Sequence, residues 1–86
     1  MNTFKLIISS PDGNTFEGDV VSLSIRGTEG ELAILAGHIP FVTSVVECDC
    51  KIELPDGTER LGHTQGGVLT VSKTSVILLS GSFKFN

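Results

Sequence analysis

Residues 28–41 read Thr-Glu-Gly-Glu-Leu-Ala-Ile-Leu-Ala-Gly-His-Ile-Pro-Phe, the longest segment of the chain with neither clean strand alternation nor simple turn chemistry. Glu29 and Glu31 flank Gly30, which is free to adopt a positive φ, and three large aliphatic residues follow closely. Pro40 biases the residue before it towards an extended conformation. The pattern predicts a displayed surface segment that carries two carboxylates, with strands before and after it.

The chain before this segment predicts two long strands. Residues 3–9 alternate between two faces, the period-2 pattern of a half-buried strand. A Pro-Asp-Gly turn within 10–14 ends this strand, and another strand should resume at Thr15. A second long strand is expected over about 19–26, stopping at Gly27, with inward-facing Val21, Leu23 and Ile25.

The chain after the segment predicts further short strands. Residues 41–47 are apolar and β-branched, and residues 51–54 alternate up to a second Pro-Asp-Gly turn, after which the return strand carries Leu61 and His63. Gly66-Gly67 indicates a bulge or a close backbone approach before a strand over 68–71. Residues 75–80 are apolar on both faces, which favours a place in the interior of a sandwich.

These patterns predict an all-β fold. No window of eleven or more residues shows the 3.6-residue apolar stripe of a capped helix, and at most residues 36–40 form one short turn. Many short strands between Gly and Pro turns favour one small antiparallel β-sandwich or flattened barrel of about eight to ten strands over residues 1–86. The expected core includes Leu23, Ile25, Leu54, Val71 and Leu78.

Composition argues against several functional classes. The 86 residues carry six basic and ten acidic side chains, a net charge of −4, and the basic residues are dispersed, which argues against a nucleic-acid surface. No apolar run approaches the roughly 20 residues of a membrane span, and the first residues lack the pattern of a secretion signal. The expected location is therefore cytosolic, or at a membrane only through partners.

Candidate catalytic groups lack the companions that catalysis needs. Glu29 and Glu31 could form an acid and base pair, but nothing nearby predicts a pocket that would shift one pKa. His38 is expected to be a hydrogen-bonding turn or interface residue, and His63, on an apolar face, a satisfied and partly buried one. Neither a Gly-x-Ser-x-Gly elbow nor a phosphate loop is present. The sequence therefore indicates no enzyme and no cofactor.

Cys48 and Cys50 would share one face of a strand. A direct disulfide between them would be strained, and Cys-x-Cys matches the usual zinc spacings poorly. Ordinary reduced thiols are the favoured interpretation. A small metal or thiol protein built on these cysteines with His38 and His63 stays open as an alternative.

The run over 30–40, Gly-Glu-Leu-Ala-Ile-Leu-Ala-Gly-His-Ile-Pro, resembles the signature of the epsilon subunit of rotary F-type ATP synthases (delta in mitochondrial naming), usually Gly-Glu-Leu-Gly-Ile-Leu-Pro-Gly-His-x-Pro. Ala33 replaces the usual Gly and Ala36 the usual Pro, which bears on the local backbone angles. The resemblance extends from Met1 to about Ser82 and includes the segments at 20–30, 52–59 and 66–71, with Gly-Gly-x-Leu-x-Val in the last. Four separated motifs in order are a specific signal.

The resemblance implies a non-catalytic subunit of the rotor. In the family this domain is a compact β-sandwich at the foot of the central stalk, packed against the gamma subunit and resting on the polar loops of the membrane c-ring. Carried over by position, Glu29, Gly30 and Glu31 would contact the c-ring loops, and the turn at His38, Ile39 and Pro40 would contact gamma. The expected location is the cytoplasmic face of the cell membrane, peripheral and only through the complex.

The resemblance also bears on domain organisation. Most family members continue into a C-terminal helical hairpin, which has no counterpart in this sequence, so the expectation is a single domain without that latch. The competing interpretation is a free-standing β-sandwich protein-interaction module that uses residues 28–41 to bind an unrelated partner.

Overall fold

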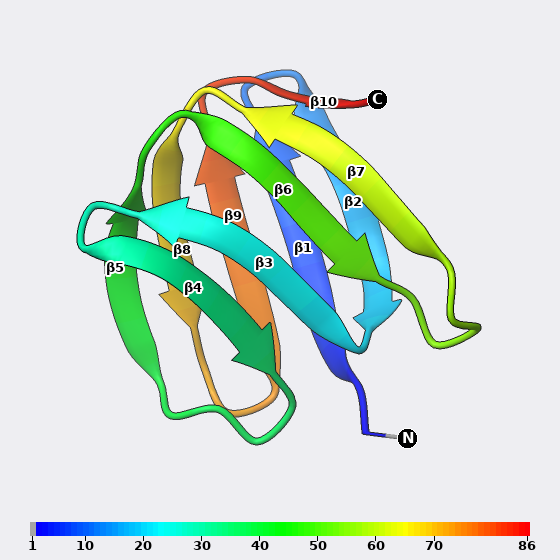
Figure 1. Ribbon diagram of the computed structural model, residues 1–86. Helices are drawn as coiled ribbons and strands as arrows, with labels where there is room; N and C mark the ends of the chain where they lie inside the picture. The colour runs from blue at the N-terminus through cyan, green and yellow to red at the C-terminus, as the bar shows by residue number, and fades with distance from the viewer. Residues whose placement is uncertain (1) are drawn as a thin grey trace.

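The computed structural model describes residues 2–86, which form ten strands and no helix (Figure 1). Within that range, accordingly, there is no helix long and apolar enough to cross a membrane. The strands are β1 (Phe4–Ser10), β2 (Gly13–Val20), β3 (Ser22–Gly27), β4 (Gly30–Leu35), β5 (Phe41–Val45), β6 (Cys48–Glu53), β7 (Glu59–Thr64), β8 (Gly67–Val71), β9 (Ser75–Ser80) and β10 (Phe83–Phe85).

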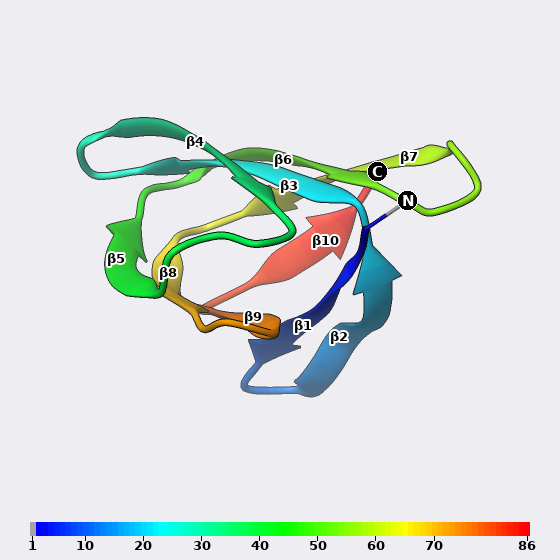
Figure 2. The ribbon, with the colours of Figure 1, turned by 90° about the horizontal axis from the view of Figure 1, so that it is seen from below.

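One continuous sheet curls over to make both layers of the sandwich. Its order is β10-β7-β6-β3-β5-β8-β9-β1-β2, with β4 added to β3, and all neighbours are antiparallel except the parallel pair β1 and β9. Figure 2 shows β3, β4, β6 and β7 in one layer and β8, β9, β1 and β2 in the other. The two ends of the sheet meet where the rings of Phe16 and Phe85 lie 6.0 Å apart. The all-β sandwich prediction is confirmed.

The core lies between the layers and follows the alternation of the strands. Four of the five predicted core residues are buried, but Leu54 is only half-buried. The reason is that β6 ends at Glu53, so Ile52 is the last residue of that strand inside the core. The buried apolar side chains are Phe4, Leu6, Ile8, Val20, Leu23, Ile25, Ile34, Val45, Cys50, Ile52, Leu69, Val71, Val76, Leu78 and Phe83.

The predicted strand over 19–26 is wrong in one respect, because the structure divides it at Val21. Val20 still belongs to β2 and pairs with Phe4 of β1, whereas the Val21 N–H donates to the Glu53 carbonyl oxygen of β6 (2.8 Å). The chain therefore passes from one layer to the other at this residue. The side chain of Val21 is half-buried instead of facing the core.

The strand over 75–80 is also less enclosed than predicted. Val76 and Leu78 of β9 are fully buried, but the alternate residue Leu79 is 53 % exposed. The strand thus has one face in the core and one face towards solvent. The expectation that both faces are interior is wrong, because the sandwich has only two layers.

The glycine pair at 66–67 does mark a close backbone approach, as predicted. A Cβ atom on Gly67 would overlap the carbonyl oxygen of Leu79 on β9. A Cβ on Gly66 would lie 2.8 Å from the Val45 carbonyl oxygen. These contacts give the Gly-Gly-x-Leu-x-Val motif a steric reason, since β8 can enter between β5 and β9 only without side chains at its start.

Candidate functional site: an exposed hairpin and its neighbours

The segment over 28–41 is more regular than the sequence indicates. Residues Gly30–Leu35 form strand β4, which pairs with β3 from Gly27 and Gly30 at the tip to Ser22 and Leu35 at the base. Thr28 and Glu29 form the turn of this hairpin, and Gly30 has a φ of 128°. The prediction of a segment without strand character is therefore wrong, although its tip is displayed as expected (Figure 1).

Ala33 and Ala36, where the resembling signature has Gly and Pro, sit in ordinary backbone. Ala33 lies within β4 and Ala36 in the turn after it. Residues 2–86 contain no positive-φ residue other than glycine. In this turn the left-handed conformation is taken by Gly37, at a φ of 82°. Both departures from the signature are thus compatible with the local geometry.

The carboxylates at the tip are held in solvent. The Glu31 side chain is 80 % exposed and its Oε1 lies 3.2 Å from Nη2 of Arg26, the residue opposite it on β3. Glu29 is exposed in the turn itself. Both residues are exposed, so the structure provides no desolvation of the kind that an acid and base pair requires.

The turn at 38–40 lies at the other end of β4 from this tip, so the structure does not bring the two predicted contact sites together. The tip includes the first two residues of β4 and the turn follows its last residue, and the six residues of β4 span about 17 Å at the usual strand rise. Ile39 is 82 % exposed and Pro40 is exposed. Both residues are therefore available for contact.

His38 is placed differently from its neighbours. Its ring packs edge-on against Phe4, with centroids 5.4 Å apart. Both ring nitrogens are buried, and neither has a hydrogen-bond partner among residues 2–86. Of the two expectations for His38, a hydrogen-bonding turn residue or an interface residue, the first does not hold among residues 2–86, and the second stays a prediction. A buried, unpaired imidazole nitrogen is costly for the fold.

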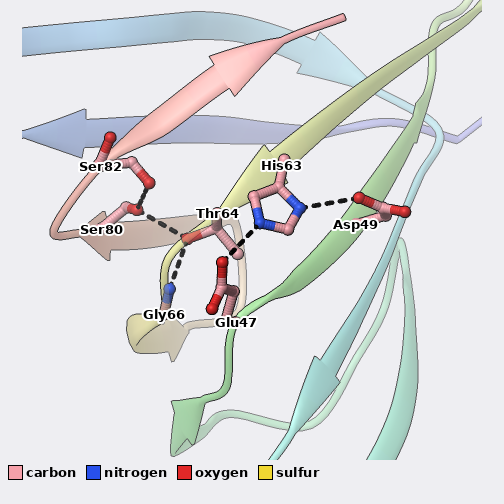
Figure 3. Close-up of polar contacts among 7 residues, drawn as sticks. All are labelled: Glu47, Asp49, His63, Thr64, Gly66, Ser80 and Ser82. Carbon is pink, nitrogen blue, oxygen red and sulfur yellow. Dashed lines mark hydrogen bonds and ion pairs between the residues drawn. The ribbon is translucent and has the colours of Figure 1, made fainter.

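His63 has the polar partners that His38 lacks (Figure 3). Its Nδ1 lies 2.8 Å from Asp49 Oδ1, and its Nε2 lies 3.0 Å from Glu47 Oε2. Hydrogen bonds to Glu47 and then to Asp49 raise the pKa of His63, because only the protonated ring donates to both carboxylates. The ring is satisfied, as predicted, but it faces outward beside exposed Leu61, so the prediction of an apolar face is wrong.

The four residues of the thiol or metal alternative do not converge. Cys48 and Cys50 lie on β6, with Cys50 buried, while His63 is engaged by carboxylates and His38 packs on Phe4. Burial and the neighbouring Cys48 raise the pKa of Cys50 to about 12, which disfavours the thiolate that binds metals. No group of three His, Cys, Asp or Glu side chains among residues 2–86 is arranged to hold a metal ion.

A surface that the sequence analysis missed is the outer apolar face, which we define as Val42, Val68 and Leu79. These residues are exposed on the adjacent strands β5, β8 and β9, and Val68 pairs directly with Leu79. The half-buried Ile77 continues the same side of β9. The second apolar face of residues 75–80 was the signal that could have revealed this surface.

Comparison with known proteins identifies the class. Residues 3–85 match the family described as "ATP synthase, Delta/Epsilon chain, beta-sandwich domain". The chain belongs to this family, the delta/epsilon chains of ATP synthase. The match covers nearly the whole sequence and includes every strand described above.

Two solved structures share the fold. A chain in the cryo-EM structure of the Euglena gracilis mitochondrial ATP synthase (OSCP/F1/c-ring, rotational state 1) superposes with a TM-score of 0.91 at 22 % identity, over 96 % of this chain and 53 % of that one. A chain from the central stalk/c-ring structure of the Tetrahymena thermophila enzyme gives 0.81 at 10 % identity, over 96 % of this chain and 66 % of that one. This chain thus spans between half and two thirds of those relatives.

Proposed function

We propose that this chain is a non-catalytic subunit of the central stalk of a rotary F-type ATP synthase, linking the gamma subunit to the c-ring and supporting the coupling of ion translocation to ATP synthesis. The observation that carries the proposal is that the tip at 28–31 and the turn at Ile39 and Pro40 are exposed at opposite ends of β4, in a chain of the delta/epsilon family. A rotor adaptor needs two such sites on one body. It needs neither a cofactor nor a catalytic group.

The carboxylate tip suits the polar loops of the c-ring. Glu31 has one exposed partner, Arg26, and an exposed ion pair contributes at most about 1 kcal/mol. Glu31 can therefore exchange that partner at little cost for an arginine or amide group of a ring loop, in a charge-assisted hydrogen bond. Glu29 and Gly30 complete the tip, and Gly30 allows the tight turn that displays both carboxylates.

The gamma contact is proposed for the turn at His38, Ile39 and Pro40. Ile39 and Val42 are both strongly exposed, at 82 % and 67 %, and Val42 belongs to the outer apolar face. Contiguous exposed apolar side chains mark protein contacts. His38 itself packs on Phe4, so in this proposal it holds the turn that presents Ile39 and Pro40.

Such a subunit must transmit torque with little deformation. The curled sheet ties all ten strands into one hydrogen-bonded unit around a closely packed core, which resists bending more than a loop or a single helix would. In this proposal the protein lies at the cytoplasmic face of the cell membrane and is held there by the complex.

The c-ring contact can be tested by charge reversal. Glu31→Lys, introduced into the ATP synthase in membranes, should reduce ion-coupled ATP synthesis several-fold, because it sets a like charge against a basic ring loop. Asp12→Lys is the matched control, since it reverses an exposed charge in another hairpin turn. Both isolated variants should melt like the wild type. Full coupling with Glu31→Lys would refute the proposed contact.

The gamma contact can be tested by placing charge on the apolar surface. Ile39→Asp combined with Val42→Asp should abolish co-purification with gamma, whereas Leu61→Asp, which also places a carboxylate at an exposed apolar site, should not. Failure of the wild-type chain itself to co-purify with gamma would instead favour the free-standing interaction module.

A further inference from the structure

Strand β4 has a free edge. It pairs along its whole length with β3, and no other strand of residues 2–86 pairs with it. An unpaired edge presents a row of backbone N–H and C=O groups that can template another strand. Figure 2 shows the β3–β4 hairpin at the margin of its layer, with β5 turning away below it.

The hydrogen bonds of β3 show which groups of β4 face outward. The Arg26 carbonyl oxygen accepts from Val46 N–H (3.2 Å), and Thr28 N–H donates to the Ser44 carbonyl oxygen (3.1 Å), so both residues direct their backbone groups away from β4. Because these directions alternate along a strand, the residues of β3 that bond β4 are Leu23, Ile25 and Gly27. The backbone groups left facing the free edge of β4 are therefore those of Glu31, Ala33 and Leu35.

The two ends of the sheet are better protected than the edge of β4. The edge strand β2 is paired through a bulge after Ile8, and β10 is only three residues long. These two edges also meet each other through Phe16 and Phe85. β4, Gly-Glu-Leu-Ala-Ile-Leu, has no proline, lysine or bulge, the usual devices that block strand addition.

An open groove runs beside the tip end of this edge. It has a volume of about 330 Å³ and lies between the hairpin and β5, lined by Gly27, Glu29, Gly30, Leu32, Phe41, Val42 and Thr43. On that side β5 pairs with β3 only at Val45 and Gly27, so its first residues also have an unpaired edge. The groove can thus receive alternate side chains of a strand laid along β4.

The charge at the groove's end selects the occupant. Glu29 lines the groove, Glu31 lies at the same end of the hairpin on the opposite face of β4, where it pairs with Arg26, and the chain carries a net charge of −4. We propose that β4 is a strand-addition site for an extended partner segment that has apolar residues at alternate positions and a basic residue at the end next to Glu29 and Glu31. This inference goes beyond the proposed function, and it does not depend on it, because it requires only the edge, the groove and the charge.

The test uses a defined peptide and the 86-residue chain. The probe acetyl-Ser-Val-Thr-Val-Thr-Val-Arg-Gly-amide, antiparallel to β4, would place its arginine beside the two glutamates. We expect saturable binding with a Kd below about 1 mM in a ¹⁵N NMR titration. Slowed amide hydrogen exchange at Glu31, Ala33 and Leu35 should accompany it.

Two controls separate strand addition from general adhesion. The same peptide with N-methyl groups on the amides facing β4 should bind at least tenfold more weakly, because it cannot complete the ladder. Ala33→Pro removes the outward N–H and places a ring on the edge, so it should also weaken binding at least tenfold, whereas Ala33→Ser should not. If Ala33→Pro fails to fold, the N-methylated peptide still decides the question.

Each other outcome overturns the proposal. Absence of binding, equal binding of the N-methylated peptide, or exchange protection on β2 or β10 instead of β4 would refute a strand-addition site here. Protection of the β4 edge in the protein alone at high concentration would show that a second copy is the occupant. If Glu31→Lys abolishes coupling but the wild-type chain does not bind the peptide, the stalk function is supported and this inference is refuted.

Discussion

Gly67→Ala should be strongly destabilising, although it adds a single methyl group. Gly67 begins β8 and pairs with Ser80 of β9 and Val45 of β5. An added Cβ would overlap the Leu79 carbonyl oxygen and lie 2.9 Å from the carbonyl carbon and 3.0 Å from the Ser80 Cα. All three are backbone atoms, which cannot rotate away. The overlap can therefore be relieved only if β8 and β9 separate at the Gly67–Ser80 pair.

The expected cost follows from that separation. Loss of two ladder hydrogen bonds at about 1 kcal/mol each, with a further kcal/mol or so of residual strain, gives about 3 kcal/mol. An 86-residue domain has a total stability of about 4–13 kcal/mol. The melting temperature should fall by roughly 12–24 °C, since each kcal/mol corresponds to about 4–8 °C for a domain of this size.

The loss of unfolding free energy can be measured by far-UV circular dichroism during urea titration. This method suits the chain because it has no tryptophan or tyrosine for a fluorescence assay. Gly81→Ala is the control: a Cβ there meets nothing within 4 Å, and its effect should stay within about 0.5 kcal/mol. Equal midpoints for the two variants would refute the steric account of the glycine pair.

Three further predictions concern the core, His63 and Cys50. Leu23→Ala should cost about 2–5 kcal/mol in the same titration because the side chain is fully buried, and Leu54→Ala clearly less; equal costs would contradict the observed burial. Since its carboxylate partners raise the pKa of His63, its contribution to stability is complete below about pH 6.5 and is lost as pH rises through the higher folded pKa. The urea midpoint advantage of wild type over His63→Gln should therefore shrink with rising pH, and an advantage that grows would be inconsistent with this network. With a pKa of about 12, Cys50 should react with iodoacetamide at pH 8 only after unfolding, so rapid alkylation of the folded protein would count against its burial.

Most of the strands could be predicted because their causes are local. Period-2 alternation and Pro-Asp-Gly turns act over a few residues, and both are visible in the chain. The division at Val21 is not local: it depends on a hydrogen bond to Glu53, 32 positions away. β4 was missed for a related reason, since its strand character comes from pairing with β3 more than from its own alternation.

The candidate site also has features with local causes, which were predictable, and features with non-local causes, which were not. The exposure of Glu29 and Glu31 follows from turn chemistry around Gly30 and was predictable. The packing of His38 on Phe4 joins residues 34 positions apart, so no local pattern contains it. The outer apolar face was misassigned because a strand that is apolar on both sides looks the same whether its second face meets another layer or a partner.

The free edge of β4 bears on how the two proposed contacts would work together. β4 is the direct connection between the tip at 28–31 and the turn at 38–40, yet it has a ladder on one side only, whereas β3 has neighbours on both sides. A strand with one ladder opens more easily than one with two, so within the isolated chain this connection is among the more deformable parts of the sheet. Addition of a partner strand to the free edge would give β4 a second ladder. Occupancy of that edge would thus stiffen the segment through which a load between gamma and the c-ring would pass in the proposed assembly.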